Sequence, residues 1–222
     1  MGSRRRRKRP SRTLDFLKAL VIVVLIGSAI RIFIAMPYRV KNIHMESGLM
    51  AGDFLLVNQL AYRSQKPVAA DIVVFKHPLK VGEHTVGRVI ATEGQTVAIR
   101  DKTVYVDNSP IAEPSTVRHS DYRIFPPDYS NRDNFAPTQV PAGMVFVLGD
   151  NRDEAEDSRH FGPIEIADIK GKGMLVYWSW RPDKNEPKWE SPYIIPAIQI
   201  FFYNLTHFPS RIDWSRLGAT PK

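Results

Sequence analysis

The sequence predicts a mainly β domain of barrel or ribbon type that follows one N-terminal transmembrane helix. Three observations predict it. Residues 19–36 are almost continuously apolar, and as a helix they would be about 27 Å long, enough to cross a bilayer core. From Val40 onward, short runs rich in Val, Ile, Phe and Tyr alternate with Gly, Pro, Asp and Asn, as in strands. The length of 222 residues, 43% of them hydrophobic, suits one globular domain with a small extra segment.

The positive charge is concentrated before the apolar segment. The chain holds 31 Lys and Arg against 23 Asp and Glu, and seven of the bases precede the first acid, Asp15. The other 24 bases and 23 acids nearly cancel, so the pI of 9.7 does not indicate a nucleic-acid partner. We expect residues 1–13 to form a cytoplasmic tail that contacts anionic lipid. The chain has no cysteine, which excludes disulfides and Cys-ligated zinc.

The segment 14–36 is predicted to be a retained anchor rather than a removed signal peptide. It is longer than the apolar core of a signal peptide, and Pro37 follows it in place of a small-residue cleavage site. Its one internal charge after Lys18, Arg31, is close enough to the end to reach the outer interface. Residues 37–222 would then form an extracytoplasmic domain.

Seven runs in this exterior domain are the clearest strands: 54–57, 72–75, 85–90, 96–99, 103–106, 144–148 and 174–177. No long helical period separates them. Residues 107–110 read as a turn that joins Tyr105 to Ile111 in a hairpin. Residues from about 113 to 141 are rich in Pro, Asp, Asn and Arg, which predicts a surface excursion or small subdomain.

The segment 191–208 is apolar and aromatic. Pro196, Gln199 and Asn204 interrupt it, so we expect it to contact the membrane face or pack under the barrel rather than form a second span.

The most informative run extends from Leu148 to Gly162, because it is highly polar yet directly follows an apolar strand. Its Asp and Arg side chains are able to satisfy one another and nearby backbone groups, and Asp157 with Arg159 is a candidate for a partly buried pair. The alternative is an ordinary solvated loop.

This run resembles the signature Gly-Asp-Asn-Arg-Asp-x-Ser-x-Asp-Ser-Arg of the type I signal peptidases. The matching positions are Gly149, Asp150, Asn151, Arg152, Asp153, Asp157, Ser158 and Arg159. Runs at 49–57, 71–76, 88–90, 177–180 and 213–216 are similar to the family in the same order. The resemblance implies a signal-peptidase-like exterior domain on the bacterial cytoplasmic membrane. It also implies a serine nucleophile and a lysine general base that cut signal peptides from exported proteins, without cofactor or metal.

The chain departs from the family where the chemistry resides. Aligned without gaps, the nucleophile position is His44 and the oxyanion-helper position is Asn42. The base position, directly before Arg88, is Gly87, and the serine that supports the lysine is replaced by Ala155. Loss of nucleophile and base together predicts an inactive peptidase, because such residues act as a unit.

Two uses of such a protein remain open. A groove at Ile43, Met45, Thr85 and Val86 would still bind signal peptides or other exported or surface proteins through backbone hydrogen bonds. Alternatively, the protein is an active peptidase with a relocated nucleophile such as Ser47. A metal or acid–base site that combines His44 with His84, completed by Glu46 or Asp153, is a further hypothesis, although no metal-ligand spacing accompanies it. A self-cleaving repressor is set aside because the anchor stands where a DNA-binding domain would be.

Overall fold

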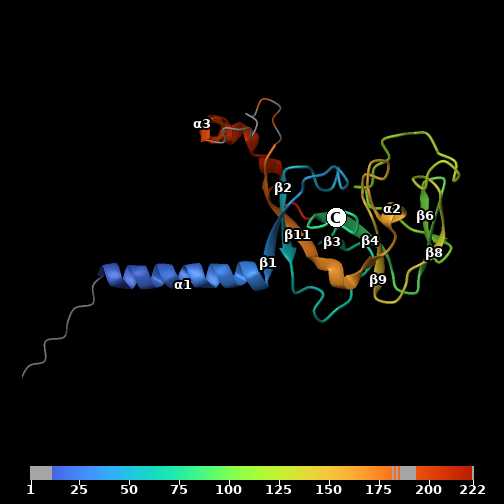
Figure 1. Cartoon of the computed structure of the whole chain (residues 1–222), viewed down its shortest axis with the longest axis horizontal. Helices are drawn as coiled ribbons and strands as arrows, with labels where there is room; N and C mark the ends of the chain where they lie inside the picture. Colours follow the sequence, from blue (N-terminus) through green and yellow to red (C-terminus); the bar gives the residue numbers. More distant parts are fainter. Residues whose placement is uncertain (1–11, 182, 184, 186–193, 222) are drawn as a thin grey trace, which may run out of the picture.

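The computed structural model describes residues 12–181, 183, 185 and 194–221, and these form two antiparallel sheets and three α-helices (Figure 1). The seven-stranded sheet has the order β1 (Ala35–Arg39), β2 (Asp53–Asn58), β11 (Ile169–Ser179), β3 (Ile72–Lys76), β4 (His84–Thr92), β9 (Met144–Leu148), β10 (Ile164–Glu165). The four-stranded sheet has the order β7 (Ser109–Pro110), β6 (Thr103–Val106), β5 (Thr96–Arg100), β8 (Phe135–Gln139). The predicted mainly β fold is confirmed.

All seven predicted strand runs lie inside observed strands. The predicted hairpin is also confirmed, since β6 pairs with β7 across Asp107 and Asn108. Both turn residues have positive φ, 51° and 63°. This is the geometry of a two-residue hairpin turn that matches strand twist, and Asp and Asn tolerate it better than most residues.

Helix α1 spans Arg12–Phe33. The predicted end of the anchor helix at Met36 is therefore wrong. Ala35 and Met36 instead begin β1, where they pair with Asn58 and Val57 of β2. Pairing with β2 and the nearby Pro37, which cannot continue a helix, explain the early end. None of the helices formed by the described residues combines the length and apolar character that a bilayer span requires. Residues 1–11 of the predicted tail lie outside the described residues.

Helix α3 (Ile194–Arg211) accounts for most of the apolar segment 191–208, whose first three residues are not described. Its helical form was not predicted. Pro196 did not prevent it, because the first turn of a helix has backbone N–H groups without an intrahelical partner, and a missing N–H costs little there.

Three hydrophobic clusters form the interior. One gathers side chains of β1, β2 and the segment after β1, including Met45 and Leu49, which are fully buried. The second joins β4, β5 and β9, and the third joins β3 and β9. Residues 113–134 contain no helix or regular strand, and β8 follows them. Strand β9 contributes side chains to the second and third clusters, and the polar run 149–157 directly follows it.

Candidate functional site

The segment 40–52 and the loop 149–157 meet at the C-terminal end of β9. The backbone N–H of Asn151 donates to the His44 carbonyl oxygen at 3.0 Å. The Asn151 side chain donates from Nδ2 to the Ile43 carbonyl oxygen at 3.2 Å. These bonds fix the nucleophile position of the resemblance, His44, directly beside the polar motif.

Gly149 permits this close approach. A Cβ atom at this position would lie 2.5 Å from the His44 carbonyl oxygen and 2.3 Å from the Cβ of Ala155. Carbon atoms normally approach no closer than about 3.5 Å. The fold therefore requires glycine here, and it brings together the positions predicted for the nucleophile and for the residue that supports the base.

The motif loop is held by buried ion pairs. Arg88 of β4 donates from Nε and Nη2 to the two carboxylate oxygens of Asp150, each at 2.7 Å. Asp157 accepts from Arg159 Nε at 2.9 Å and from the Gly149 backbone N–H at 3.0 Å. Both members of each pair are less than 5% exposed. The predicted Asp157–Arg159 pair is confirmed, and the alternative of a solvated loop is wrong.

The other motif residues bind the same region. Ser158 Oγ accepts from the Val147 N–H at 3.0 Å, which attaches α2 (Ser158–Phe161) to β9. Arg152 donates from Nε to the Gly149 carbonyl at 3.1 Å, and Asp153 accepts from Lys102 Nζ at 2.8 Å. The motif thus builds the frame around His44 and contributes none of its groups to the cavity described below.

The segment that carries His44 is also held by the C-terminal end of the chain. Arg216, in the 3₁₀ helix η2 (Trp214–Arg216), donates to both carboxylate oxygens of Asp53 at 2.6–3.0 Å and to the Gly48 carbonyl at 2.8 Å. Asp53 is fully buried. Ion pairs at both ends of the site therefore position the backbone of residues 44–53.

The base position, Gly87, lies on β4 opposite Val73 of β3 and beside the end of β9. A Cβ atom there would contact Phe75 Cε1 at 3.4 Å and the Leu148 carbonyl oxygen at 3.5 Å, which are ordinary van der Waals distances. The position has space for a side chain's first carbon. Packing therefore does not explain why glycine stands at Gly87.

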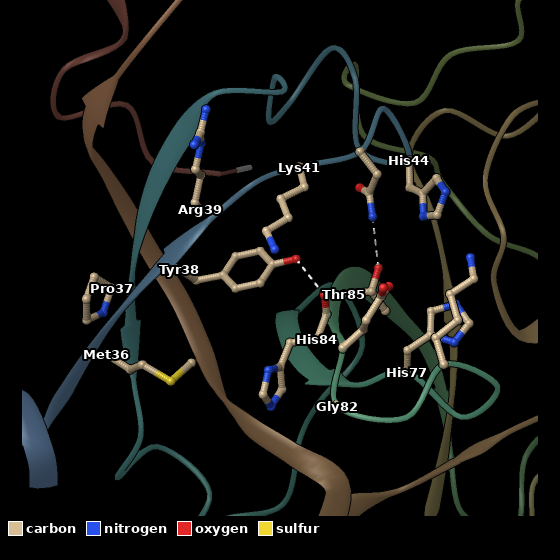
Figure 2. Close-up of a pocket in the computed structure, with 13 residues that line it drawn as sticks. Met36, Pro37, Tyr38, Arg39, Lys41, His44, His77, Gly82, His84 and Thr85 are labelled. Carbon is tan, nitrogen blue, oxygen red and sulfur yellow. Dashed lines mark hydrogen bonds between the residues drawn. The ribbon is translucent and has the colours of Figure 1, made fainter. Parts of the chain in front are cut away.

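A cavity of about 400 Å³ opens between β1 and the start of β4 (Figure 2). Its polar lining includes Tyr38, Lys41, Asn42, His44, His77 and Lys80. Two side-chain bonds connect its walls. Tyr38 donates from its hydroxyl to the His84 carbonyl at 3.0 Å, and Asn42 donates from Nδ2 to Thr85 Oγ1 at 3.2 Å.

Burial controls protonation in this cavity. It lowers the pKa of His44 from its ordinary value of 6.5, against the opposing effects of Glu156 and Asp157, so the imidazole is neutral at pH 7. Burial, with a smaller contribution from Glu83, raises the pKa of Tyr38 to about 12. The Tyr38 hydroxyl therefore stays a hydrogen-bond donor across the physiological range.

The four residues predicted for the groove occupy different environments. Thr85 lines the cavity. Met45 and Val86 instead belong to the hydrophobic core, and Ile43 is exposed at 44% but is not among the lining residues. Thr85 and Val86 are consecutive on β4, and successive side chains of a strand point to opposite faces. Ser47, the alternative nucleophile, is exposed, has φ of 107° and does not line the cavity.

His77, Lys80 and Glu83 are not among the residues predicted for the site, yet all three line the cavity. They lie in the turn region between β3 and β4, and no local pattern indicates that this turn faces residues 38–44. His44 and His84 both line the cavity as well. Across the described part of the chain, no group of three or more His, Asp or Glu side chains is arranged to hold a metal ion.

A mainly β domain in which this motif holds the segment with His44 at the end of β9 defines a signal-peptidase-like protein. The family model "Signal peptidase, peptidase S26" matches residues 13–178. The chain therefore belongs to the signal peptidase family.

Relatives agree with this assignment. The chain is 36% identical to signal peptidase I V of Bacillus subtilis over 162 residues, which cover 70% of this chain and 93% of that protein. It is 33% identical over 168 residues to the probable thylakoidal processing peptidase 2 of Arabidopsis thaliana. That match covers 72% of this chain but only 43% of the length of the relative. A solved signal peptidase I from Enterococcus faecalis is 32% identical, with a TM-score of 0.39, and the match covers 49% of this chain and 97% of that one.

Proposed function

We propose that this chain is a signal-peptidase-like membrane protein that binds extended segments of exported or surface proteins without cutting them. One observation carries the proposal. His44 and Gly87 stand at the family's nucleophile and base positions, on either side of the end of β9, within an otherwise retained frame.

The remaining groups of the cavity are poorly suited to replace a serine and a lysine. A lysine base needs a desolvated amine whose pKa is lowered. The two lysines of the lining, Lys41 and Lys80, are both exposed, and the hydrogen bond of Lys80 with Glu156 raises the pKa of Lys80 instead. Among the lining residues, hydroxyl groups belong to Tyr38 and Thr85. The first has a raised pKa, and the second is 2% exposed and bonded to Asn42.

The cavity walls support peptide binding that needs no catalytic group. In the described sheet, β1 is the outermost strand and has one free edge. Strand β4 pairs with β9 only from Arg88 onward. The residues His84–Gly87 therefore pair with β3 alone. Two unpaired strand edges that face a cavity offer backbone donors and acceptors to an extended peptide.

A cleavage assay tests the loss of activity. The purified full chain in detergent is compared with a variant that carries His44→Ser, Gly87→Lys, Asn42→Ser and Ala155→Ser, with a preprotein as substrate. We expect cleavage by the variant alone, because the frame is intact and only the reacting groups are restored. The matched control is the same variant with Gly87→Ala in place of Gly87→Lys, which should not cleave.

Cleavage by the unmodified chain would contradict the proposal. Its loss on Ser47→Ala would then identify Ser47 as the nucleophile of the alternative, active peptidase. Binding is measured separately, by fluorescence anisotropy of a labelled signal-peptide segment. Failure of the unmodified chain to bind such segments would contradict the binding role.

We also propose that the N-terminal segment holds the protein at the bacterial cytoplasmic membrane, with the exterior domain on the far side from the cytoplasm. The support is the apolar run and basic tail of the sequence, together with α1 side chains from Phe16 to Ile26 that are about half to two thirds exposed. Alkaline washing of membranes should leave the full chain bound, and external protease should digest the exterior domain in spheroplasts. Release by the wash would contradict the anchor.

A further inference from the structure

One end of the cavity gathers nitrogen groups. His44 and His77 lie at this end (Figure 2). Lys80 is a further lining residue. Lys80 lowers the pKa of His44 through its charge, and His77 does so when it is protonated. Glu83 is the only carboxylate among the residues that line the described cavity, and it acts on Tyr38.

His77 presents a buried donor without an acceptor. Its Nδ1 accepts from the Leu79 backbone N–H at 3.1 Å, so in the neutral imidazole the proton is on Nε2. The residue is 6% exposed, and Nε2 has no hydrogen-bond partner. A buried donor left in this state is costly, and an oxygen atom supplied by a ligand would relieve that cost.

The molecule already places one carboxylate beside this end of the cavity. Glu156 Oε2 accepts from Lys80 Nζ at 2.5 Å and lies 3.6 Å from His77 Nε2, just beyond hydrogen-bond distance. Glu156 comes from the motif loop, its side chain is 34% exposed, and it is not a lining residue. The hydrogen bond with Lys80 lowers the pKa of Glu156, so it is ionised at pH 7.

We propose that the His44–His77–Lys80 end of the cavity is a carboxylate subsite that selects extended peptides with an acidic group, and that Glu156 occupies its edge until such a peptide binds. The inference rests on the proposed peptide binding and specifies its substrate class. The incoming carboxylate accepts from His77 Nε2–H and displaces Glu156 from Lys80. No bond to carbon forms or breaks.

Fluorescence anisotropy with short, labelled alanine-rich peptides tests this with the full chain in detergent. The peptides of the first series have an amidated C-terminus and carry a single Asp at successive positions. The peptides of the second series carry Asn in place of that Asp. A third peptide has no acidic side chain but a free C-terminal carboxylate. We expect the best Asp peptide to bind at least about fivefold more tightly than its Asn partner, which corresponds to about 1 kcal/mol. Preference for the third peptide instead would identify the terminal carboxylate as the source.

Two variants and a matched control locate the subsite. Lys80→Gln removes the ammonium and leaves Glu156 unpaired, so the Asp-over-Asn ratio should fall to about one. Glu156→Gln removes the competing charge and should raise that ratio by about threefold or more. Lys76→Gln is the control, because Lys76 is also an exposed cation paired with a carboxylate, Asp168 at 2.9 Å, but does not line the cavity.

The outcomes separate the two proposals. If no peptide binds, the proposed binding function fails. If peptides bind and no carboxylate, internal or terminal, improves affinity, the function stands and the carboxylate subsite is refuted. An acidic preference that Lys76→Gln lowers as much as Lys80→Gln does would also refute the subsite, because it would reflect the general surface charge.

Discussion

Replacement of Gly149 by alanine tests whether the motif frame depends on one close contact. The new Cβ would lie 2.3 Å from the Cβ of Ala155 and 2.5 Å from the His44 carbonyl oxygen. Neither neighbour is the flexible end of a long side chain. To relieve the overlap, the end of β9 must move about an ångström away from both Ala155 and the segment with His44.

The cost follows from these contacts. Overpacking of a rigid interior costs about 1–3 kcal/mol. Movement of the His44 carbonyl also weakens the 3.0 Å hydrogen bond that it accepts from the Asn151 N–H, which adds about 1 kcal/mol. We expect Gly149→Ala to lower the free energy of unfolding by about 3 kcal/mol.

Gly87→Ala is the matched control, since its Cβ meets neighbours no closer than 3.4 Å. It should be neutral or stabilise the protein by up to about 1 kcal/mol, because glycine in a strand loses more backbone entropy on folding than alanine does. Urea unfolding of both variants in detergent, followed by the fluorescence of the four tryptophans, gives the comparison. Equal unfolding midpoints for the two variants would refute the argument from close packing.

Three further predictions concern the cavity and its supports. Tyr38→Phe removes the bond to the His84 carbonyl and should cost about 1 kcal/mol in urea unfolding, while the freed carbonyl should tighten peptide binding; weaker binding would contradict a groove at this edge. Arg216→Gln leaves the buried Asp53 carboxylate unpaired and should cost about 3–5 kcal/mol in the same assay; a loss below about 1 kcal/mol would contradict its role. Burial lowers the pKa of His44 in the folded state, so the unfolded chain binds more protons near pH 6 and stability falls as pH decreases through 6.5. His44→Gln should therefore flatten the acid side of the stability curve, and an unchanged slope would contradict burial as the cause.

Much of the fold was predictable because strand patterns are local. Each of the seven predicted runs is short, and at least half of its residues are β-branched or aromatic. The strand β1 was not predicted, because it directly continues the apolar helical segment and composition does not mark the change at Ile34. Helix α3 was not predicted because its prolines and mixed composition obscure the helical period.

The site was predictable only in part, because most of its contacts join residues that are far apart in the sequence. The Asp157–Arg159 pair joins residues that are close in sequence, and the polar motif predicts it. The Arg88–Asp150 pair spans 62 positions, and Lys80 meets Glu156 across 76. Such contacts depend on how the curled sheet brings β4 and the turn before it to the end of β9. The resemblance located His44 and Asn42 of the cavity lining, but not Tyr38, His77 or Lys80.

The retained motif is explained by folding rather than by chemistry. Asp150, Asp157 and Arg159 are each less than 5% exposed and paired, and loss of one partner leaves an uncompensated buried charge at a cost of about 3–5 kcal/mol. The position of Gly87 carries no such constraint, since its neighbours are at ordinary distances. Selection for a stable fold alone would retain Asp150, Asp157 and Arg159 but would permit substitutions at position 87. The buried pairs of the run from Gly149 to Arg159 therefore indicate that the frame is intact, and activity is a separate question that the cleavage assay with substitutions at positions 42, 44, 87 and 155 addresses.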